Sequence, residues 1–495
     1  MDNFEVELKL SISPDDVAAF RRATVLSGVQ PTRRKLTSVY YDTPGCELRK
    51  AGMALRLRKA GRHWTQTLKG GPSGLGGLHE RHEWETARPD ATIDLTALAG
   101  SMLDRAGGES VGERLQPAFT VAFERETWDV ELAPGTRVEV ALDRGAASAG
   151  KASEAVCEVE IELIEGDRGA AFDFARALAA EVTLHPSVVT KAERGYRLLS
   201  GEGLQPSRAQ RVALDPGMSL GDAARALVGT SLAQVQANEE GLLSATDPEF
   251  VHQARVGLRR MRSALRTFRA ALPPEASRWR NELGSLARTL GEARDWDVFA
   301  TETLPPLAKA FGDSALARKL ARRASVPRVR AREAARDALR SKEFARLVLD
   351  LARWLSESGP ENDAPSESLA TFAANLVNKR HKRLVADAAG LAQRTPEERH
   401  AVRIDAKRLR YAVDGFASLF RAKRVDRYLE NLAALQDVLG ASNDAATATR
   451  LLAGLAPPAD FAAFARGYLA ARIEGDVRSA QARVDKLASA KKLRS

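Results

Sequence analysis

Charged residues at every second position open the chain. The stretch Phe4–Leu10 places Glu5, Glu7 and Lys9 in strict alternation with apolar residues. Side chains at i, i+2 and i+4 of a β-strand share one face, so two carboxylates and one ammonium group would point the same way. Carboxylate oxygens suit hard cations, whereas ammonium and guanidinium groups bind phosphate oxygens. The pattern indicates chemistry on a metal-bound phosphate, although a solvated face with salt bridges would explain this strand taken alone.

The same alternation returns in six later stretches, and their charged faces together carry both signs. Burying so many charges is costly unless they pair with one another or bind a charged ligand. If these faces turn inward around one space, they would surround a polyphosphate chain and its metal ion. The six stretches are Met53–Arg58, Trp64–Lys69, Arg81–Glu85, Phe119–Trp128, Arg137–Leu142 and Cys157–Leu163.

Many short alternating segments with few helices are typical of an antiparallel barrel. We therefore predict an α+β domain over residues 1–200, in which an antiparallel β-barrel or strongly curved sheet is flanked by helices. Helical periodicity interrupts the strands at Pro14–Ser27 and at Arg168–Glu181. The glycine-rich stretch Lys69–Gly77 lacks the Gly-Lys-Ser/Thr ending of a P-loop, so it predicts a hairpin loop.

From about residue 215 the pattern changes to Ala, Leu and Arg, with apolar residues recurring every three or four positions. This periodicity predicts an all-α helical bundle after a linker at 201–214. A second break at Glu357–Ser366 divides the bundle into two related units, roughly 215–356 and 367–495. The repeat is visible in two matching pairs of segments. They are His252-Gln-Ala-Arg with His400-Ala-Val-Arg, and Leu290-Gly-Glu-Ala-Arg-Asp with Leu439-Gly-Ala-Ser-Asn-Asp.

Basic residues form a stripe on the first repeated helix and return on the second. Spacings of three and four place them on one helical face, where like charges repel mildly and need a counter-charge. A solvated basic face balanced by nearby carboxylates is one interpretation, and a groove for a polyanion is the favoured one. The candidate polyanion ligands are His252, Arg255, Arg259, Arg262, Arg266, His381, His400, Arg403, Lys407 and Arg410.

Charge and composition narrow the classes of partner. Residues 1–200 carry 26 Lys and Arg against 30 Asp and Glu, whereas residues 201–495 carry 49 against 35. The basic second half favours an anionic partner, but sparse aromatic residues and the lack of a DNA-reading motif disfavour nucleic acid. Cys46 and Cys157 make no disulfide framework, and no apolar run approaches the ~20 residues of a membrane span. We expect a cytoplasmic protein with no membrane partner.

Taken in order, the charged motifs of residues 1–200 resemble the CYTH superfamily, the triphosphate tunnel enzymes. Glu5-Val-Glu-Leu-Lys is similar to the ExExK opening of that superfamily. The motifs that follow are Tyr41-Asp-Thr, Leu55-Arg-Leu-Arg, Thr67-Leu-Lys, Arg81-His-Glu-Trp-Glu, Glu139-Val-Ala-Leu-Asp-Arg-Gly, Cys157-Glu-Val-Glu-Ile-Glu-Leu and Lys191-Ala-Glu-Arg-Gly-Tyr. The resemblance implies an eight-stranded tunnel that hydrolyses inorganic triphosphate to pyrophosphate and phosphate with Mg²⁺, or with Mn²⁺ as an alternative.

The same resemblance implies roles for individual residues. The implied metal ligands are Glu5, Glu7, Glu158 and Glu160. The implied phosphate-binding residues are Arg56, Arg58, Lys69, Arg125 and Lys191. The residues that would line the tunnel and orient water or a second metal are Lys9, Glu83, Glu85, Glu139 and Asp143. Glu162 could face the tunnel or end its strand in water, and the group that accepts the proton of water stays open.

Residues 215–495 resemble the CHAD domain, a helical module with two repeats and recurrent histidine and basic residues. The resemblance rests on the His-x-x-Arg stripe and the Leu-Gly-x-x-Arg/Asn-Asp segments, and it implies binding of inorganic polyphosphate. Association with polyphosphate granules is a further expectation. Three alternatives remain: adenylate cyclase chemistry, thiamine triphosphate hydrolysis in the same tunnel, or a non-catalytic polyphosphate-binding protein that targets granules.

Overall fold

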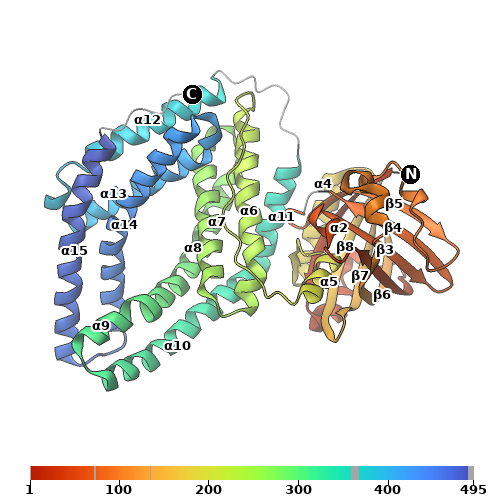
Figure 1. Cartoon of the computed structure of the whole chain (residues 1–495), viewed down its shortest axis with the longest axis horizontal. Helices are drawn as coiled ribbons and strands as arrows, with labels where there is room; N and C mark the ends of the chain where they lie inside the picture. Colours follow the sequence, from red (N-terminus) through yellow and green to blue (C-terminus); the bar gives the residue numbers. More distant parts are fainter. Residues whose placement is uncertain (1, 72–73, 134, 358–366, 489–495) are drawn as a thin grey trace. The chain divides into compact units, whose positions relative to one another are not determined.

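The computed structural model describes residues 2–71, 74–133, 135–357 and 367–488, which form two compact units (Figure 1). The first unit consists of Met1–Gln205 together with Leu339–Glu357, and the second of Pro206–Ala338 together with Ser358–Ser495. Residues 339–357, which the sequence pattern assigns to the first helical repeat, therefore lie in the first unit. Helical periodicity identifies an apolar face but does not say which core will cover that face.

A closed antiparallel barrel of eight strands forms the centre of the first unit. The strand order is β5-β4-β3-β2-β6-β7-β8-β1, and the barrel closes because β1 also pairs with β5. A short ninth strand, β9, pairs with the end of β1. This architecture confirms the predicted eight-stranded barrel. The strands are β1 Asp2–Ile12, β2 Thr32–Asp42, β3 Met53–Ala60, β4 His63–Gly70, β5 Leu78–Arg88, β6 Gln116–Ala133, β7 Thr136–Ala149, β8 Ala152–Glu165 and β9 Leu184–Pro186.

Helices flank the barrel, and one of the two predicted helical stretches is broken. Arg168–Glu181 forms a single helix as expected, whereas Pro14–Ser27 splits into two 3₁₀ turns around the short helix α1. The split occurs because Ala23 adopts an extended backbone with ψ of 134° before the second turn. The helices of this unit are α1 Val17–Phe20, α2 Glu47–Lys50, α3 Gly108–Gly112, α4 Arg168–Glu181, α5 Lys191–Ser200 and α11 Lys342–Ser356.

The barrel is polar inside and apolar outside. The apolar residues that alternate with the charged ones, such as Leu8, Val159 and Ile161, are buried against helix α4 through Phe172 and Leu178. The charged residues of the same strands therefore point into the barrel, because alternate side chains of a strand face opposite sides. Burial of the outer face under helices stabilises a barrel whose interior is kept free for polar groups.

Every secondary-structure element that the structure describes in the second unit is a helix, as predicted. Its two repeated basic helices begin alike: α7 has Asp247 as N-cap before Pro248, and α13 has Thr395 as N-cap before Pro396. Proline suits the first helical position because its missing N–H is not needed there. The helices are α6 Leu220–Ser244, α7 Pro248–Thr267, α8 Ala276–Val298, α9 Leu304–Phe311, α10 Ser314–Leu339, α12 Leu369–Asp387, α13 Pro396–Gly415, α14 Ala422–Ala453 and α15 Ala459–Ala488. Among the described residues, every helix is too short or too polar to cross a bilayer.

Candidate functional site

A polar cavity of about 310 Å³ lies inside the barrel. Side chains from six strands line it, together with Tyr40 of β2 and with Thr190 and Lys191 at the start of α5. Both signs of charge are present, so the inward faces of the strands bring cations and carboxylates together. The charged lining consists of Glu5, Glu7, Lys9, Arg56, Arg58, Lys69, Arg81, Glu83, Glu85, Arg125, Glu160, Glu162 and Lys191.

One group of lining charges is arranged around Lys69 of β4. Its Nζ donates to Glu5 Oε2 at 2.5 Å and lies 3.3 Å from Glu83 Oε2. Arg56 extends the group, with its guanidinium 3.9 Å from Glu83 Oε1. Burial raises the pKa of Glu5 despite the opposing charge of Lys69, and the neighbouring carboxylates add to the rise. A further cation beside Glu5 would therefore be favourable, because the buried negative charge is incompletely compensated.

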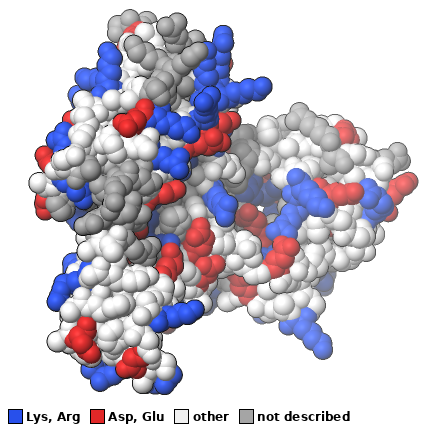
Figure 2. Space-filling view, turned by 60° about the vertical axis from the view of Figure 1, so that its left-hand side comes forward, with Lys and Arg blue, Asp and Glu red and all other residues white. Residues whose placement is uncertain are grey.

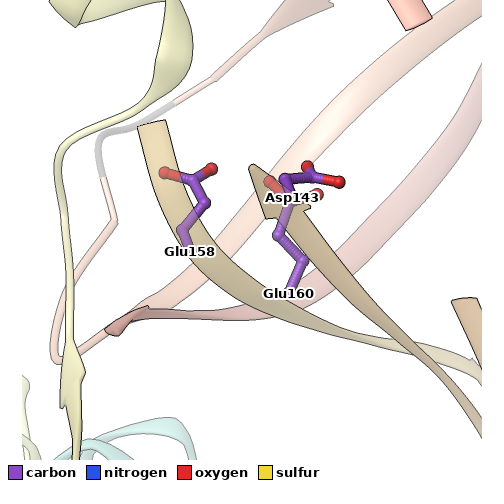
Figure 3. A group of neighbouring side chains, drawn as sticks. All are labelled: Asp143, Glu158 and Glu160. Atoms are coloured by element: carbon purple, nitrogen blue, oxygen red, sulfur yellow. The ribbon is translucent and has the colours of Figure 1, made fainter. Parts of the chain in front are cut away.

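A second group brings three carboxylates of β7 and β8 together, as Figure 3 shows for Asp143, Glu158 and Glu160. One oxygen of each lies within 4.8 Å of the others. Lys191 Nζ bridges them at 2.6 Å, 2.5 Å and 2.8 Å respectively. The buried Oε2 atom of Glu158 has no hydrogen-bond partner in the described part of the chain. Such an oxygen set suits a hard divalent cation, and the unpaired oxygen of Glu158 is available as a ligand atom for it.

Lys9 lies on β1, the strand that pairs with β8 on the side away from β7. Its Nζ donates to Glu158 Oε1 at 3.1 Å and also to Glu160. Burial opposes its charge, but Glu158, Glu160 and Glu7 raise the pKa of Lys9 well above its ordinary value. Lys9 is therefore a permanent cation whose ammonium group fixes the orientation of the carboxylates of β8.

Three guanidinium groups give the cavity its anion-binding character. Burial, followed by the charges of Arg56 and Arg125, lowers the pKa of Arg58 to about 10. The buried Nε of Arg56 has no hydrogen-bond partner among the described residues. Burial acts to raise the pKa of the Tyr40 hydroxyl, but the charges of Arg56 and Arg58 outweigh this effect and lower the pKa. Cations that repel one another and leave a donor unused would be stabilised by a bound anion, and Arg suits phosphate oxygens.

Helix α5 carries Lys191 into this site. Thr190 caps the helix through a capping box, because its side chain accepts from Glu193 N while Glu193 accepts from Thr190 N at 3.0 Å. Gly195 allows the helix to rest on Phe119, since a Cβ there would lie 2.0 Å from the ring. The capping box and the contact with Phe119 fix the start of α5, where Lys191 is the first residue. The ammonium group of Lys191 is therefore held at the carboxylates.

The structure places most, but not all, of the predicted tunnel residues on the cavity. Within the described chain, Glu139, Asp143 and Glu158 are absent from its lining, and the last two reach it through their bridges to Lys191. Glu162, left open from the sequence, faces the cavity, and burial followed by the charge of Glu5 raises its pKa to about 8. The lining residues Tyr40, Arg81 and Thr190 are not among the predicted site residues, although the Thr-x-x-Glu capping box was a readable signal for Thr190.

A second cavity, of about 480 Å³, lies in the helical unit. Arg259 of α7 and Arg403, Lys407 and Arg410 of α13 line it, so the two repeats contribute equivalent helices. The buried Nε atoms of Arg259 and Arg403 have no hydrogen-bond partner among the described residues. Burial, followed by the charges of Arg403 and Arg259, lowers the pKa of Lys407 to about 7. The carboxylates of Glu302, Asp437 and Asp444 also line this cavity, but among the described residues no ion pair joins them to its four cations, so the unused guanidinium donors favour an anionic ligand.

The remaining predicted polyanion ligands do not line this second cavity. The guanidinium group of Arg255 donates to Ala287 O at 3.0 Å. It also packs on Gly291, where an added Cβ would lie 2.5 Å from Nη1 of Arg255. His381 is hydrogen-bonded to the hydroxyl of Tyr428. The other members of the set that are absent from the lining, among the described residues, are His252, Arg262, Arg266 and His400.

Two arginines of the first stripe form a separate basic cluster. The charges of Arg280, Arg288 and Arg408 act on Arg262 and Arg266, and burial together with these charges lowers the pKa of both. The face drawn in Figure 2 carries basic and acidic side chains interspersed, so the net positive charge does not form one uniform surface there. On this face, a specific anion site would have to be local, at a cavity or cluster.

Comparisons with known proteins agree with this division. The CYTH domain family matches residues 3–196, and the CHAD domain family matches residues 226–453. An inorganic triphosphatase of Haemophilus influenzae is 32% identical over 201 residues, which are 40% of this chain and 56% of that protein. The chain thus spans little more than half the length of this relative.

Two further relatives extend to the helical unit. An uncharacterized protein of Mycobacterium tuberculosis is 26% identical over 468 residues, covering 89% of this chain and 86% of that protein. The crystal structure of the CHAD domain from the plant Ricinus communis is 36% identical, with a TM-score of 0.52, and covers 59% of this chain and 99% of that one. The protein therefore belongs to the CYTH and CHAD families, with a CYTH domain over residues 3–196 followed by a CHAD domain over residues 226–453.

Proposed function

We propose that the barrel cavity hydrolyses inorganic triphosphate to pyrophosphate and phosphate with Mg²⁺, with Mn²⁺ as an alternative, and that the helical unit binds polyphosphate. The observation that carries the proposal is a pair of unused buried atoms, one on a cation that lines the cavity and one on a carboxylate that Lys191 joins to it. Arg56 offers an unpaired donor, and Glu158 offers an unpaired carboxylate oxygen. The similarity to a protein named inorganic triphosphatase supports this choice of substrate.

The cations of the barrel would bind and orient the phosphate chain. Arg56, Arg58 and Arg125 present guanidinium groups that bind phosphate oxygens, and Lys69 and Lys191 add ammonium groups. Because these donors are already held by strand pairing and by helix α5, they need little reorganisation when negative charge moves in the transition state. They would therefore lower the barrier to transfer of a phosphoryl group to water.

The carboxylates would hold the metal ion. Glu5 and Glu7 of β1 and Glu158 and Glu160 of β8 supply the oxygen ligands that Mg²⁺ prefers. A bound divalent ion would neutralise phosphate charge and polarise the phosphorus centre. Lys9 would keep Glu158 and Glu160 in the orientation that this role requires, because it donates to both.

The test is phosphate release from tripolyphosphate, ATP and thiamine triphosphate, with and without Mg²⁺. We expect rapid metal-dependent release from tripolyphosphate, and loss of that release in Glu5→Gln/Glu7→Gln. The matched control is Glu131→Gln/Glu165→Gln, which removes two exposed carboxylates of the same barrel and should retain full activity. Cyclic AMP formed from ATP would replace the proposal with a cyclase, and a preference for thiamine triphosphate would change the substrate. Tight polyphosphate binding without any release would leave a binding protein.

Polyphosphate binding by the helical unit has a separate test. We expect Arg259→Ala/Arg403→Ala to weaken polyphosphate binding, and the control Arg318→Ala/Arg322→Ala, at exposed positions of α10, to have little effect. Binding to either polyanion would depend steeply on salt, so competition between polyphosphate and duplex DNA at constant salt is the discriminating measurement. Displacement of polyphosphate by DNA at comparable concentration would contradict the assignment.

A further inference from the structure

Helix α11 lies in the middle of the CHAD sequence but belongs to the barrel unit. Leu339–Glu357 clusters with the barrel, and the chain on both sides of this segment belongs to the helical unit. Leu349 and Ala352 are fully buried in the apolar core that also contains Leu10 and Leu78 of the barrel. The outer wall of the barrel therefore includes a helix that the chain supplies about 140 residues after the CYTH sequence has ended.

Polar contacts fix the register of α11 on the barrel unit. Lys342 Nζ donates to the carbonyl oxygens of Ala180 and Glu181 at 3.1 Å each, which satisfies the C-terminal end of α4. The carboxylate of Asp350, which is only 6% exposed, lies 3.0 Å from Arg176 Nε. A helix held at its start and at its middle cannot slide along its partner without breaking one of these contacts.

Helix α11 also packs tightly against the hairpin loop before β5. Gly76 has a positive φ of 63°, and a Cβ at that position would lie 2.4 Å from the Cβ of Ala352. Glycine is therefore required at 76 for space as well as for backbone conformation. The methyl group of Ala352 sets the distance between the helix and the loop backbone.

That loop is hydrogen-bonded directly to the backbone of Lys9. Lys9 N donates to Gly77 O at 2.8 Å, and on the other side Ser187 N donates to Lys9 O at 2.8 Å. Lys9 is the residue where β1 leaves its pairing with β5, which ends at Leu8, and begins to pair with β9 at Leu10. The position of its backbone therefore depends on the loop that α11 supports.

We propose that α11 is a positioning element of the barrel site: Ala352 holds the loop at Gly76 and Gly77, and through this loop it sets the position of Lys9 among the carboxylates of β8. This inference rests on the proposed hydrolysis for its kinetic consequence, but not for its structural one. A displacement of about 1 Å in a catalytic group lowers rates by about 10²-fold. A larger side chain at 352 must push the loop away, because neither the helix nor the glycine leaves space for it.

The test uses the full chain with Ala352→Leu, Ala352→Ser as the nearly isosteric variant, and Ala334→Leu as the matched control at an exposed helical position. We expect Ala352→Leu to lower kcat for tripolyphosphate by about 10²-fold with KM changed far less, because the phosphate-binding arginines lie on β3 and β6, whereas the displaced loop is hydrogen-bonded to Lys9 of β1. Ala352→Ser and Ala334→Leu should keep both constants within about threefold. Hydrogen exchange at the Lys9 amide should become faster in Ala352→Leu alone, since its bond to Gly77 is disturbed.

The exchange measurement separates this inference from the proposed function. If the wild type releases no phosphate but Lys9 exchange still responds to Ala352→Leu, hydrolysis is wrong and the positioning role stands. Unchanged Lys9 exchange in a folded Ala352→Leu protein would overturn the positioning role, whatever the activity. If Ala352→Leu unfolds at a lower temperature than the wild type, amide hydrogen exchange is compared in the two units. Loss of protection in the barrel unit supports the inference, and loss confined to the helical unit overturns it.

Discussion

The barrel cavity and the helical cavity hold similar cations in different electrostatic surroundings. In the barrel, Lys191 and Arg125 are each bound closely by carboxylates, with Lys191 touching three of them. In the helical unit, Arg259 and Arg403 leave buried donors unused, and Arg410 is held by the neutral side chain of Gln436. Glu302, Asp437 and Asp444 also line the helical cavity, but among the described residues no ion pair joins them to its cations. Carboxylates held close to cations can bind a metal ion beside a phosphate, whereas cations without an ion pair are suited to holding an anion alone.

The largest expected difference is in stability. We predict that Lys191→Met lowers the free energy of unfolding of the barrel unit by about 3–5 kcal/mol, because it leaves Asp143, Glu158 and Glu160 buried without their bridging cation. Urea unfolding followed by hydrogen exchange in each unit measures the loss. The control Lys151→Met removes an exposed lysine of the same barrel and should change little. An equally stable Lys191→Met barrel would mean that the carboxylate cluster is not a charged unit.

Removal of the unpaired donor of Arg56 tests whether the barrel cavity binds the reacting phosphate. Arg56→Met should reduce kcat/KM for tripolyphosphate by about 10²–10³-fold, which is typical for removal of one preorganised donor to a developing anion. The exposed Arg62→Met on the adjoining turn is the matched control. Steady-state phosphate release gives the ratio. Equal kinetics for the two variants would move the phosphate site away from β3.

The pKa of Lys407 gives the helical cavity its own signature. Because burial and nearby arginines lower this pKa to about 7, the free lysine is mostly protonated at pH 6 and mostly neutral at pH 8. A polyanion binds the protonated form better, so the affinity for polyphosphate should fall about tenfold over this interval at fixed salt. Lys407→Arg should remove most of the pH dependence, since arginine stays charged. Fluorescence titration at the two pH values is sufficient, and a flat wild-type profile would contradict the prediction.

The smallest expected effect completes the contrast. Arg403→Met should leave the unfolding free energy of the helical unit within about 0.5 kcal/mol of wild type, or raise it slightly, because burial lowers the pKa of Arg403 although the carboxylates of Asp444 and Asp295 raise it, and its buried Nε is unused. The same denaturation experiment that measures Lys191→Met provides the comparison. A loss as large as the one predicted for the barrel would mean that Asp444 or Asp295 stabilises Arg403 as an ion pair, and it would abolish the distinction between the two cavities.

Local pattern was enough to predict the barrel and most of its lining. Strands have a side-chain period of two, so the alternation around Glu5, Arg56 and Glu160 determines which side chains share a face, and the apolar partners must turn toward the helices. The repeated basic helices were equally readable, because His252-Gln-Ala-Arg and His400-Ala-Val-Arg recur at equivalent places in the two units. Tyr40 was missed because it is uncharged and so falls outside the charged pattern. Arg81 was missed although its spacing from Glu83 and Glu85 places it on the same strand face.

What the sequence by itself determined, then, is the two-domain order, the inward charged faces and the basic stripes, since each follows from a local period and from the cost of burying charge. Only the tertiary structure decided which basic residues of each stripe line a cavity and which pack elsewhere. A helix rises about 1.5 Å per residue, so a stripe running from His252 to Arg266 is too long for one cavity, and its members separate between two sites and the helix packing. The location of α11 was also decided by tertiary structure, because an apolar helical face can be buried by any core of complementary shape, and here the barrel provides it.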